Sequence, residues 1–321
     1  MYSYLRNEIL HVSGDMGQYP VFDVFGLEGS NHVCLYEERD TKQRVVGKYF
    51  GSIERPFEEA ERRMEREFKS LEYLRQMGFN RYPHYVARPL GRNAGIGCVL
   101  VVEYCNGESL SHFIKKAIRE GDRASLFKKL TSLSFFLARL HNYTAEGDKV
   151  DFRIEGQYFE SIIRQHARAG FLNQEAQNEF IRLLHYWQEN PIVWEDRQVL
   201  VHGDATPANF LFGDDPWVIV IDLERMRRAD RVFDVGRMAG ELKHFFMKYA
   251  GNAEAAEPFI GHFLWEYSCH FPDRDQAFAA ICRRVPFYMG LTLLRVSRNS
   301  WIGENYRNAL FNEARNILKG K

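Results

Sequence analysis

The segment from Val199 to Glu224 combines acidic and amide side chains with short apolar runs and reads V-L-V-H-G-D-A-T-P-A-N-F-L-F-G-D-D-P-W-V-I-V-I-D-L-E. We expect a strand that ends at His202, a loop that carries Asp204 and Asn209, and a returning strand that places Asp222 at its end. Such a hairpin would bring three oxygen-bearing side chains together.

Phosphoryl transfer suits these residue types, because it needs an aimed nucleophile and a neutralised phosphate charge rather than covalent help from the protein. Asp204 would accept or orient an acceptor hydroxyl, while Asn209 and Asp222 would hold Mg²⁺, which prefers oxygen ligands. Each residue alone is more simply explained as part of a turn or strand end. The combination D-x4-N, apolar strand, I-D-x-E favours phosphotransfer. We expect His202 to shape the loop by packing and hydrogen bonding.

The motifs H-G-D-A-T-P-A-N and I-D-L-E resemble those of the aminoglycoside phosphotransferase and choline kinase family, a branch of the protein-kinase-like fold. In that family these motifs carry the catalytic aspartate, a metal-binding asparagine and a metal-binding aspartate, which correspond to Asp204, Asn209 and Asp222. The resemblance covers most of the chain in order. It implies transfer of the γ-phosphate of ATP, with GTP as an alternative donor, to a hydroxyl of a small molecule.

The resemblance also requires a lysine on a strand and an acidic partner on a helix. Lys48 ends the apolar run V-V-G-K, where it would reach the α- and β-phosphates; the competing interpretation is a surface lysine. In the helix expected over 57–77, Glu67 lies near the centre of an apolar stripe formed by Met64, Phe68, Leu71, Leu74 and Met77. A buried carboxylate needs a partner, and Lys48 is the obvious candidate.

Two further nucleotide contacts follow from the order of the motifs. The turn F-G-L-E-G-S offers Gly26, Gly29 and Ser30 as phosphate contacts, although two glycines between strands also fit an ordinary hairpin turn. The run V-V-E-Y-C-N-G resembles the hinge between kinase lobes, where backbone groups of Glu103 and Cys105 would hydrogen-bond adenine. An ordinary strand end followed by a glycine turn has the same local sequence.

Downstream acids and arginines leave alternatives open. Asp234 lies where the family often places an aspartate that braces the catalytic loop, but it also fits an exposed acid at a helix start. Glu224 would either assist the metal site or pair with a nearby arginine. The basic run from Arg225 to Arg231 suggests an anionic or phosphorylated sugar or alcohol as acceptor, since arginine forks suit phosphate and carboxylate. A solvated charged face is the competing interpretation.

The elements that must position these residues form an α+β, bilobal pattern. The first lobe, residues 1–105, is expected to hold a five-stranded antiparallel sheet and the helix 57–77, with strands over 19–25, 32–37, 44–50, 85–90 and 98–104. The second lobe, residues 106–321, is expected to be mainly helical, with helices over 109–118, 124–141, 159–169 and 174–187 and again from about 233. The β-rich segment 198–222 interrupts it.

Composition and cysteine spacing exclude several further classes of protein. With 43 basic and 43 acidic side chains among 321 residues, no overall field attracts nucleic acid or an anionic membrane. Five cysteines without paired spacing argue against a disulfide framework or zinc site and favour a reducing cytoplasm. No stretch approaches the roughly 18 apolar residues of an integral membrane segment. The oligomeric state is left open.

The acceptor class follows from what the sequence lacks. Protein kinases continue from their metal-binding aspartate to F-G, a long activation segment and A-P-E, whereas Asp222 is followed by Leu223-Glu224 and then helical sequence. A small-molecule acceptor is therefore expected. Two alternatives stay open: a kinase of lipopolysaccharide core sugars, and a nucleotide-binding pseudokinase or regulatory module without turnover. The presence of Lys48, Glu67 and the three motif residues opposes the second.

Overall fold

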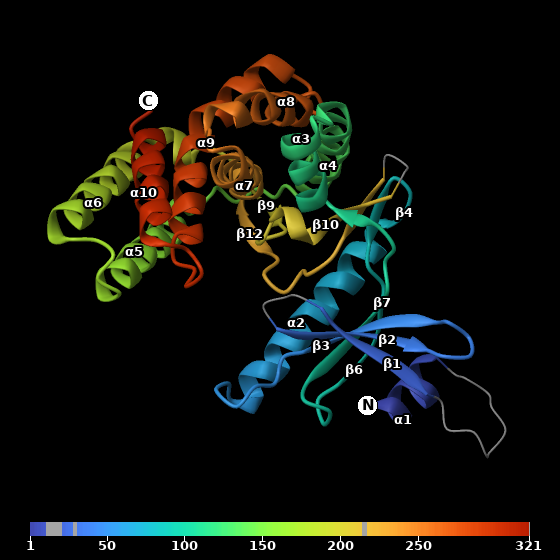
Figure 1. Cartoon of the computed structure of the whole chain (residues 1–321). Helices are drawn as coiled ribbons and strands as arrows, with labels where there is room; N and C mark the ends of the chain where they lie inside the picture. Colours follow the sequence, from blue (N-terminus) through green and yellow to red (C-terminus); the bar gives the residue numbers. More distant parts are fainter. Residues whose placement is uncertain (11–20, 28–30, 214–216, 321) are drawn as a thin grey trace. The chain divides into compact units, whose positions relative to one another are not determined.

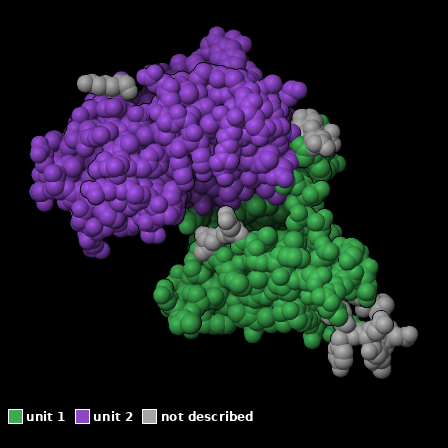
Figure 2. Space-filling view, in the orientation of Figure 1, with its two compact units in different colours: residues 1–107, 213–225 green, residues 108–212, 226–321 purple. Residues whose placement is uncertain are grey.

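The computed structural model describes residues 1–10, 21–27, 31–213 and 217–320. They form two compact units: unit 1 is Met1–Gly107 with Gly213–Arg225, and unit 2 is Glu108–Phe212 with Met226–Lys321 (Figure 2). We expected the segment 213–225 in the second lobe. It belongs to unit 1 because its strand pairs with a strand of that unit and Asp222 bonds Lys48.

Unit 1 contains the expected five-stranded antiparallel sheet, in the order β1-β2-β3-β7-β6 (Figure 1). Its strands are β1 (Phe22–Leu27), β2 (His32–Glu38), β3 (Arg44–Tyr49), β6 (Pro89–Asn93) and β7 (Val99–Glu103). One face packs on the N-terminal α1 (Tyr2–Tyr4) and η1 (Leu5–Leu10). Side chains alternate along a strand, so Val45 and Tyr49 face this segment, whereas Lys48 faces the helix α2 (Phe57–Gln76).

The expected strand over 85–90 is wrong, because this stretch divides between two sheets. The strand β5 (His84–Val86) pairs antiparallel with β4 (Asn80–Arg81) and parallel with β11 (Val218–Val220). A new strand, β6, then begins at Pro89 on the edge of the main sheet. Proline lacks a backbone N–H and is accepted at the first residue of an edge strand, which is why the chain changes sheets here.

Unit 2 is mainly helical, as expected. Its helices are α3 (Leu110–Glu120), α4 (Arg123–Tyr143), α5 (Phe152–Arg168), α6 (Gln174–Glu189), α7 (Val232–Ala250), α8 (Glu257–Ser268), α9 (Arg274–Val296) and α10 (Glu304–Leu318), with short turns η2 (Pro191–Trp194), η3 (Pro207–Asn209) and η4 (Glu254–Ala256). Side chains of Ser109, Asp122, Asn173 and Asp273 cap helix starts by accepting backbone N–H bonds. The helix expected from Phe159 begins at Phe152, because Asp151 caps it there.

Short strands hold the segment that carries the motifs. The strand β9 (Gln198–Val201) pairs antiparallel with β12 (Arg227–Asp230), and β10 (Phe210–Phe212) pairs with β8 (Glu108–Ser109). We did not expect β12, because its sequence R-R-A-D is polar and resembles an exposed run. The pairing of β12 with β9 fixes the position of β9 and therefore the start of the loop that follows Val201.

Helix α7 lies in the middle of unit 2, in contact with α3, α8 and α9 (Figure 1). Two glycines of α7 allow the close approach of α9: a Cβ added at Gly240 would lie 2.7 Å from Thr292 Cβ, and one at Gly236 would meet Tyr288. Helix α9 is long and apolar enough to cross a membrane. However, 61% of its apolar 18-residue stretch is buried within the protein, as in a core helix.

The α7–α9 contact gives a stability prediction. Replacing Gly240 by alanine places a methyl group against the Cβ of Thr292, so we expect a loss of about 1–3 kcal/mol in the free energy of unfolding. Gly261 in α8 is exposed and has open space, so Gly261→Ala should stabilise by about 1 kcal/mol through helix propensity. Urea unfolding followed by circular dichroism measures both. Equal midpoints for the two variants would contradict the packing argument.

Candidate active site

In unit 1 a buried lysine contacts three carboxylates. Lys48 Nζ on β3 lies 2.7 Å from Glu67 Oε2 on α2, 2.7 Å from Asp222 Oδ1 and 3.5 Å from Glu224 Oε2. Lys48 is only 8% exposed and Glu67 3%, so the surface-lysine interpretation is wrong and the expected Lys48–Glu67 contact is present. The apolar stripe of α2 places Glu67 between Met64 and Leu71, both buried.

The electrostatics of this group favour a charged lysine. Burial by itself would lower the pKa of Lys48, but the carboxylates of Glu67, Asp222 and Glu224 outweigh it and raise that pKa above its ordinary value. Burial raises the pKa of Glu67 to about 7, although Lys48 acts in the opposite direction. Lys48 thus contacts three carboxylates, and the buried Glu67 ionises less readily than an ordinary glutamate.

Glu224 pairs with arginine, as one of the two alternatives that the sequence left open requires. Its carboxylate contacts Lys48, accepts a hydrogen bond of 3.1 Å from Asn31 Nδ2, and lies 3.0 Å from the guanidinium of Arg63. Asp222 stands just before it with a φ of +62°, a left-handed conformation that asparagine and aspartate adopt more readily than other side chains. Such strained backbone gathers at functional sites.

The same carboxylates suit a divalent cation. One oxygen each of Glu67, Asp222 and Glu224 lies within 4.8 Å of the others. Lys48, Arg63 and Arg225 supply three positive charges beside these carboxylates, with Arg225 at 3.6 Å from Glu224. Hard oxygen ligands are what Mg²⁺ prefers.

In unit 2 the loop after β9 carries the remaining motif residues. Asn209 in η3 donates from Nδ2 to the backbone oxygen of Asp204 at 2.9 Å, which ties the two ends of the loop together. The ring of His202 is fully buried, packs on Phe210 at 5.2 Å between ring centroids, and its Nδ1 accepts from the N–H of Asp204 at 3.3 Å. These contacts agree with the loop-shaping role that we expected for His202.

Asp234 is fully buried near the start of α7, so the interpretation as an exposed acid is wrong. It accepts backbone N–H bonds from His202 at 2.6 Å and Gly203 at 3.1 Å, and His141 Nε2 lies 3.2 Å from it. Burial alone would raise the pKa of Asp234, but these hydrogen bonds and charges hold it below its ordinary value. A charged Asp234 thus fixes the loop backbone.

Sequence reasoning missed three charged residues around Asp204. Arg237 on α7 donates to Asp204 Oδ1 at 2.7 Å and to the carbonyl of Gly203 at 2.9 Å. Arg295 on α9 lies 3.8 Å from Asp204 and donates to Glu241. The sequence did contain a signal for the two residues on α7. Asp234, Arg237 and Glu241 are spaced three and four residues apart, which places their charges on one face of a largely apolar helix.

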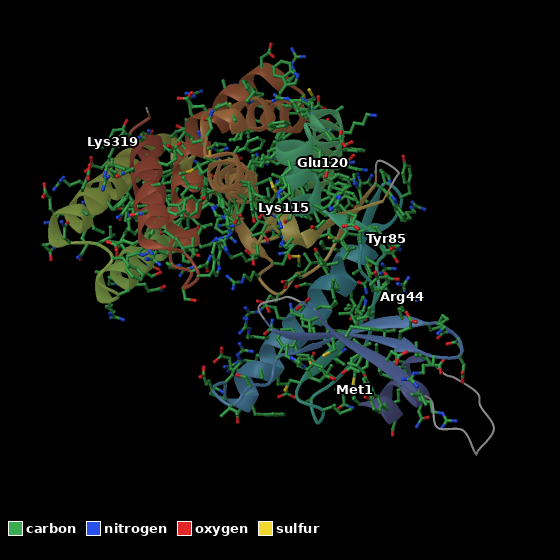
Figure 3. The ribbon with its side chains drawn as sticks, in the orientation of Figure 1. Met1, Arg44, Tyr85, Lys115, Glu120 and Lys319 are labelled. Carbon is green, nitrogen blue, oxygen red and sulfur yellow. The ribbon has the colours of Figure 1, made fainter. Side chains whose placement is uncertain are left out.

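The expected nucleotide contacts lie in unit 1. Gly26 pairs with Cys34 within the β1–β2 hairpin, whereas Gly29 and Ser30 lie outside the described residues. Glu103 ends β7, where its N–H donates to the Arg88 carbonyl at 3.0 Å. Its carboxylate accepts from the hydroxyl of Tyr85 at 2.6 Å; Tyr85 is labelled in Figure 3.

Cys105 follows Glu103 by two residues. Burial raises the pKa of the Cys105 thiol to about 12, so this side chain is not a reactive nucleophile. Only its backbone groups suit the contact with adenine that we expected.

The basic run is engaged within the protein. Arg227 pairs with Glu155 at 2.7 Å, Arg228 pairs with Glu146, and Arg231 pairs with Asp196 at 3.1 Å. Arg225, with a side chain 47% exposed, lies 3.6 Å from Glu224. Arg227 and Arg228 belong to β12 and fasten it to neighbouring elements. An acceptor site and a solvated face both stay predictions for this run.

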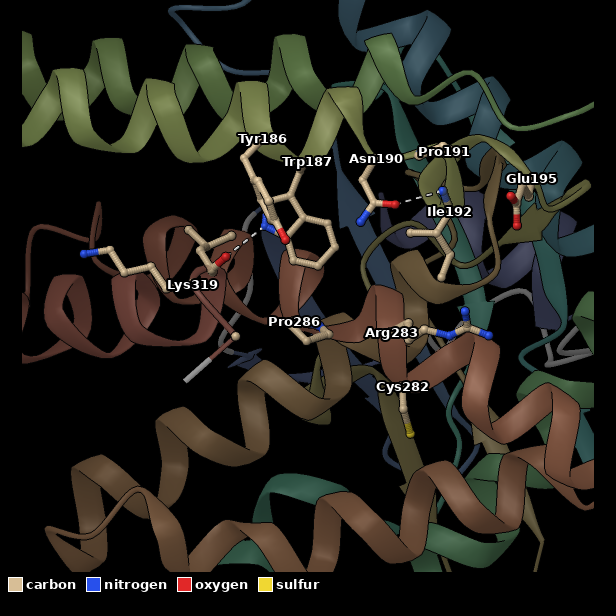
Figure 4. Close-up of a pocket in the computed structure, with 12 residues that line it drawn as sticks. Tyr186, Trp187, Asn190, Pro191, Ile192, Glu195, Cys282, Arg283, Pro286 and Lys319 are labelled. Carbon is tan, nitrogen blue, oxygen red and sulfur yellow. Dashed lines mark hydrogen bonds between the residues drawn. The ribbon is translucent and has the colours of Figure 1, made fainter.

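A cavity of about 530 Å³ lies elsewhere in unit 2, among α6, η2, α9 and α10 (Figure 4). Trp187 donates to the Leu318 carbonyl at 3.0 Å and Asn190 accepts from the N–H of Ile192 at 3.2 Å. Two of the polar groups that line it are thus bonded to the backbone. None of the site residues expected from the sequence lines this cavity.

Solved structures similar to the chain are kinases of small molecules. A choline kinase from Cryptosporidium parvum superposes with a TM-score of 0.66 at 12% identity, covering 99% of this chain and 94% of that one. An amicoumacin kinase bound to AMP-PNP and Ca²⁺ gives 0.62 at 16% identity, covering 93% and 88%. An ADP-bound aminoglycoside phosphotransferase, APH(2'')-Ib, gives 0.60 at 11% identity, covering 99% and 98%. At these identities the likeness shows the protein-kinase-like fold.

The sequence itself was compared with curated proteins and with protein families. No curated protein matched significantly. Residues 36–269, which contain every site residue expected from the sequence except Gly26, Gly29 and Ser30, match the phosphotransferase enzyme family. The chain therefore belongs to the phosphotransferase enzyme family, the family of the aminoglycoside and choline kinases, whose members phosphorylate hydroxyl groups of small molecules.

Proposed function

We propose that the protein transfers the γ-phosphate of ATP, in the presence of Mg²⁺, to a hydroxyl group of a small molecule. The observation that carries this proposal is the contact of buried Lys48 with both Glu67 and Asp222 at 2.7 Å. A lysine so enclosed needs carboxylates to stay charged. Bound phosphate would be a further anionic partner for this ammonium group, and a divalent cation would be a partner for the carboxylates.

In unit 1, Lys48 binds the α- and β-phosphates, and Glu67 orients its ammonium group. Asp222 holds the metal ion, with Glu224 beside it. Mg²⁺, when bound, neutralises the charge of the phosphates. Backbone groups of Glu103 and Cys105 bind adenine; the turn with Gly26, Gly29 and Ser30 is proposed to cover the phosphates.

In unit 2, Asp204 orients the acceptor hydroxyl and accepts its proton as the new bond from the acceptor oxygen to the γ-phosphorus forms. The bond from the γ-phosphorus to the bridging oxygen breaks and ADP leaves with that oxygen. Asn209 would offer its amide oxygen as a ligand to the metal ion. Asp234 and His202 keep the loop in the conformation that presents Asp204.

The acceptor is proposed only as a hydroxyl-bearing small molecule. Similar structures act on amicoumacin, choline and ethanolamine, which differ widely in shape and charge. The fold therefore does not choose among them. Three arginines of the basic run have ion-pair partners within the protein, so the run does not by itself favour an anionic acceptor or a lipopolysaccharide core sugar.

The role of Lys48 is tested by Lys48→Met. We expect kcat/KM for ATP to fall about 100-fold, because a preorganised positive charge on the phosphates is lost. Lys69→Met is the matched control, since Lys69 lies on α2 with a side chain 74% exposed. Transfer from radiolabelled ATP to a panel of aminoglycosides, amino-alcohols and sugars measures both. Equal activity of the two variants would remove Lys48 from the site.

Asp204 and Asp222 should fail in different ways. Asp204→Asn is expected to lower kcat about 100- to 10,000-fold while ATP still binds, because the proton acceptor is lost. Asp222→Asn should also raise the Mg²⁺ concentration needed for half-maximal activity, since a metal ligand is lost. Asp275→Asn serves as control, because Asp275 is 75% exposed at the start of α9. Nucleotide binding by the wild type without transfer to any acceptor or to water would instead identify a module without turnover.

A further inference from the structure

We propose that Arg237 is a positioning residue for Asp204, which fixes both the carboxylate and the backbone of the loop that carries it. This inference rests on the proposed function, because Asp204 is there the group that orients the acceptor hydroxyl. Neither the family resemblance nor the motifs pointed to Arg237. Its role follows from contacts within unit 2 alone.

A single nitrogen of Arg237 makes both contacts. Its Nη1 donates to Asp204 Oδ1 at 2.7 Å and to the carbonyl oxygen of Gly203 at 2.9 Å. The side chain is 5% exposed and that of Asp204 18%, so little water competes for these bonds. Hydrogen bonds between charged groups are the stronger ones, and the planar guanidinium fixes their directions.

Arg237 completes a hold on the loop that Asp234 begins. On the same face of α7, Asp234 accepts the N–H groups of His202 and Gly203, while Arg237 donates to the Gly203 carbonyl one residue before Asp204. One helix thus bonds two N–H donors and one carbonyl acceptor of the loop backbone. The φ of Gly203 is +80°, a conformation that glycine adopts without strain. Because glycine is also free to adopt other conformations, the bonds from Asp234 and Arg237 are what hold the loop in this shape.

A second arginine shares the carboxylate of Asp204 with Arg237 and is itself held by Glu241. Arg295 lies 3.8 Å from Asp204 Oδ1, and its other terminal nitrogen donates to Glu241, one turn beyond Arg237 on α7. Positive and negative side chains therefore alternate in the order Arg237, Asp204, Arg295, Glu241. With two of each sign the group has no net charge. Its arrangement suits the holding of Asp204 rather than the capture of a charged acceptor.

The close approach of α7 and α9 makes this arrangement possible. Gly240 on α7 packs against Thr292 on α9, and Arg295 follows Thr292 by three residues on the same face. Glu241 adjoins Gly240. A bulkier residue at 240 would move Arg295 away from both of its partners.

The experiment compares Arg237→Lys and Arg237→Gln with the wild type and with a control for the loss of a buried arginine. Arg307 serves as that control: it is 7% exposed and donates to the carbonyl oxygens of Ser297 and Ile302. Steady-state transfer from ATP to the best acceptor of the panel gives kcat and KM. Hydrogen exchange of peptides covering 198–212 reports the loop without any need for turnover.

We expect Arg237→Gln to lower kcat about 100-fold, as small misplacements of reacting groups do, while the KM for ATP changes less than about twofold. Arg237→Lys should recover part of kcat, and millimolar guanidinium should partly rescue Arg237→Ala. Exchange across 202–204 should speed up in Arg237→Gln. Arg307→Gln should leave the loop exchange and kcat near wild type, even where it lowers stability.

Two outcomes would overturn the inference: loop exchange in Arg237→Gln equal to that of wild type, or a loss of kcat no larger than in Arg307→Gln. If the wild type transfers no phosphate, the proposed function fails, and the exchange data then decide alone whether Arg237 holds the loop. A fall in stability without faster exchange at 202–204 would make Arg237 a residue of the fold only.

Discussion

A buried charge must find its compensation within the unit that buries it, and this constraint organises the protein. In unit 1 Lys48 is enclosed, and the carboxylates around it decide where α2 and the strand before Asp222 can lie. In unit 2 the fully buried Asp234 takes its hydrogen bonds from the loop backbone. Breaking either set would leave an unpaired charge in a low-dielectric interior, at a cost of several kcal/mol. The same bonds that avoid this cost also aim the functional groups.

Helix α7 joins packing to chemistry in unit 2. Its glycines admit α9, while its charged residues Asp234, Arg237 and Glu241 hold the loop and Arg295. An apolar residue in place of Asp234 or Arg237 would leave polar groups of the loop without these partners. The helix is therefore both the core of the unit and the support of Asp204, and changes to its packing reach the loop directly.

The fold by itself does not decide which acceptor the protein takes. Kinases of similar fold act on an antibiotic, on choline and on ethanolamine, at identities of 16% or less. In this chain the arginines after Asp222 looked like an acceptor site, yet they fasten β12 to α5 and to the turns around it. A run of charged residues in the sequence does not show whether those residues pair with other side chains of the protein or with a ligand.

The sequence by itself determined the fold class, the main sheet, the inward position of Glu67 and its pairing with Lys48, because periodicity and local motifs encode which faces are buried. Only the tertiary structure decided what depends on contacts distant in sequence. It divided the strand at Pro89, paired β12 with β9, buried Asp234 and brought Arg237 and Arg295 to Asp204. Arg237 lies 33 residues from Asp204, and its local pattern does not name that partner, since a helix or strand records only that a face is buried, not what covers it.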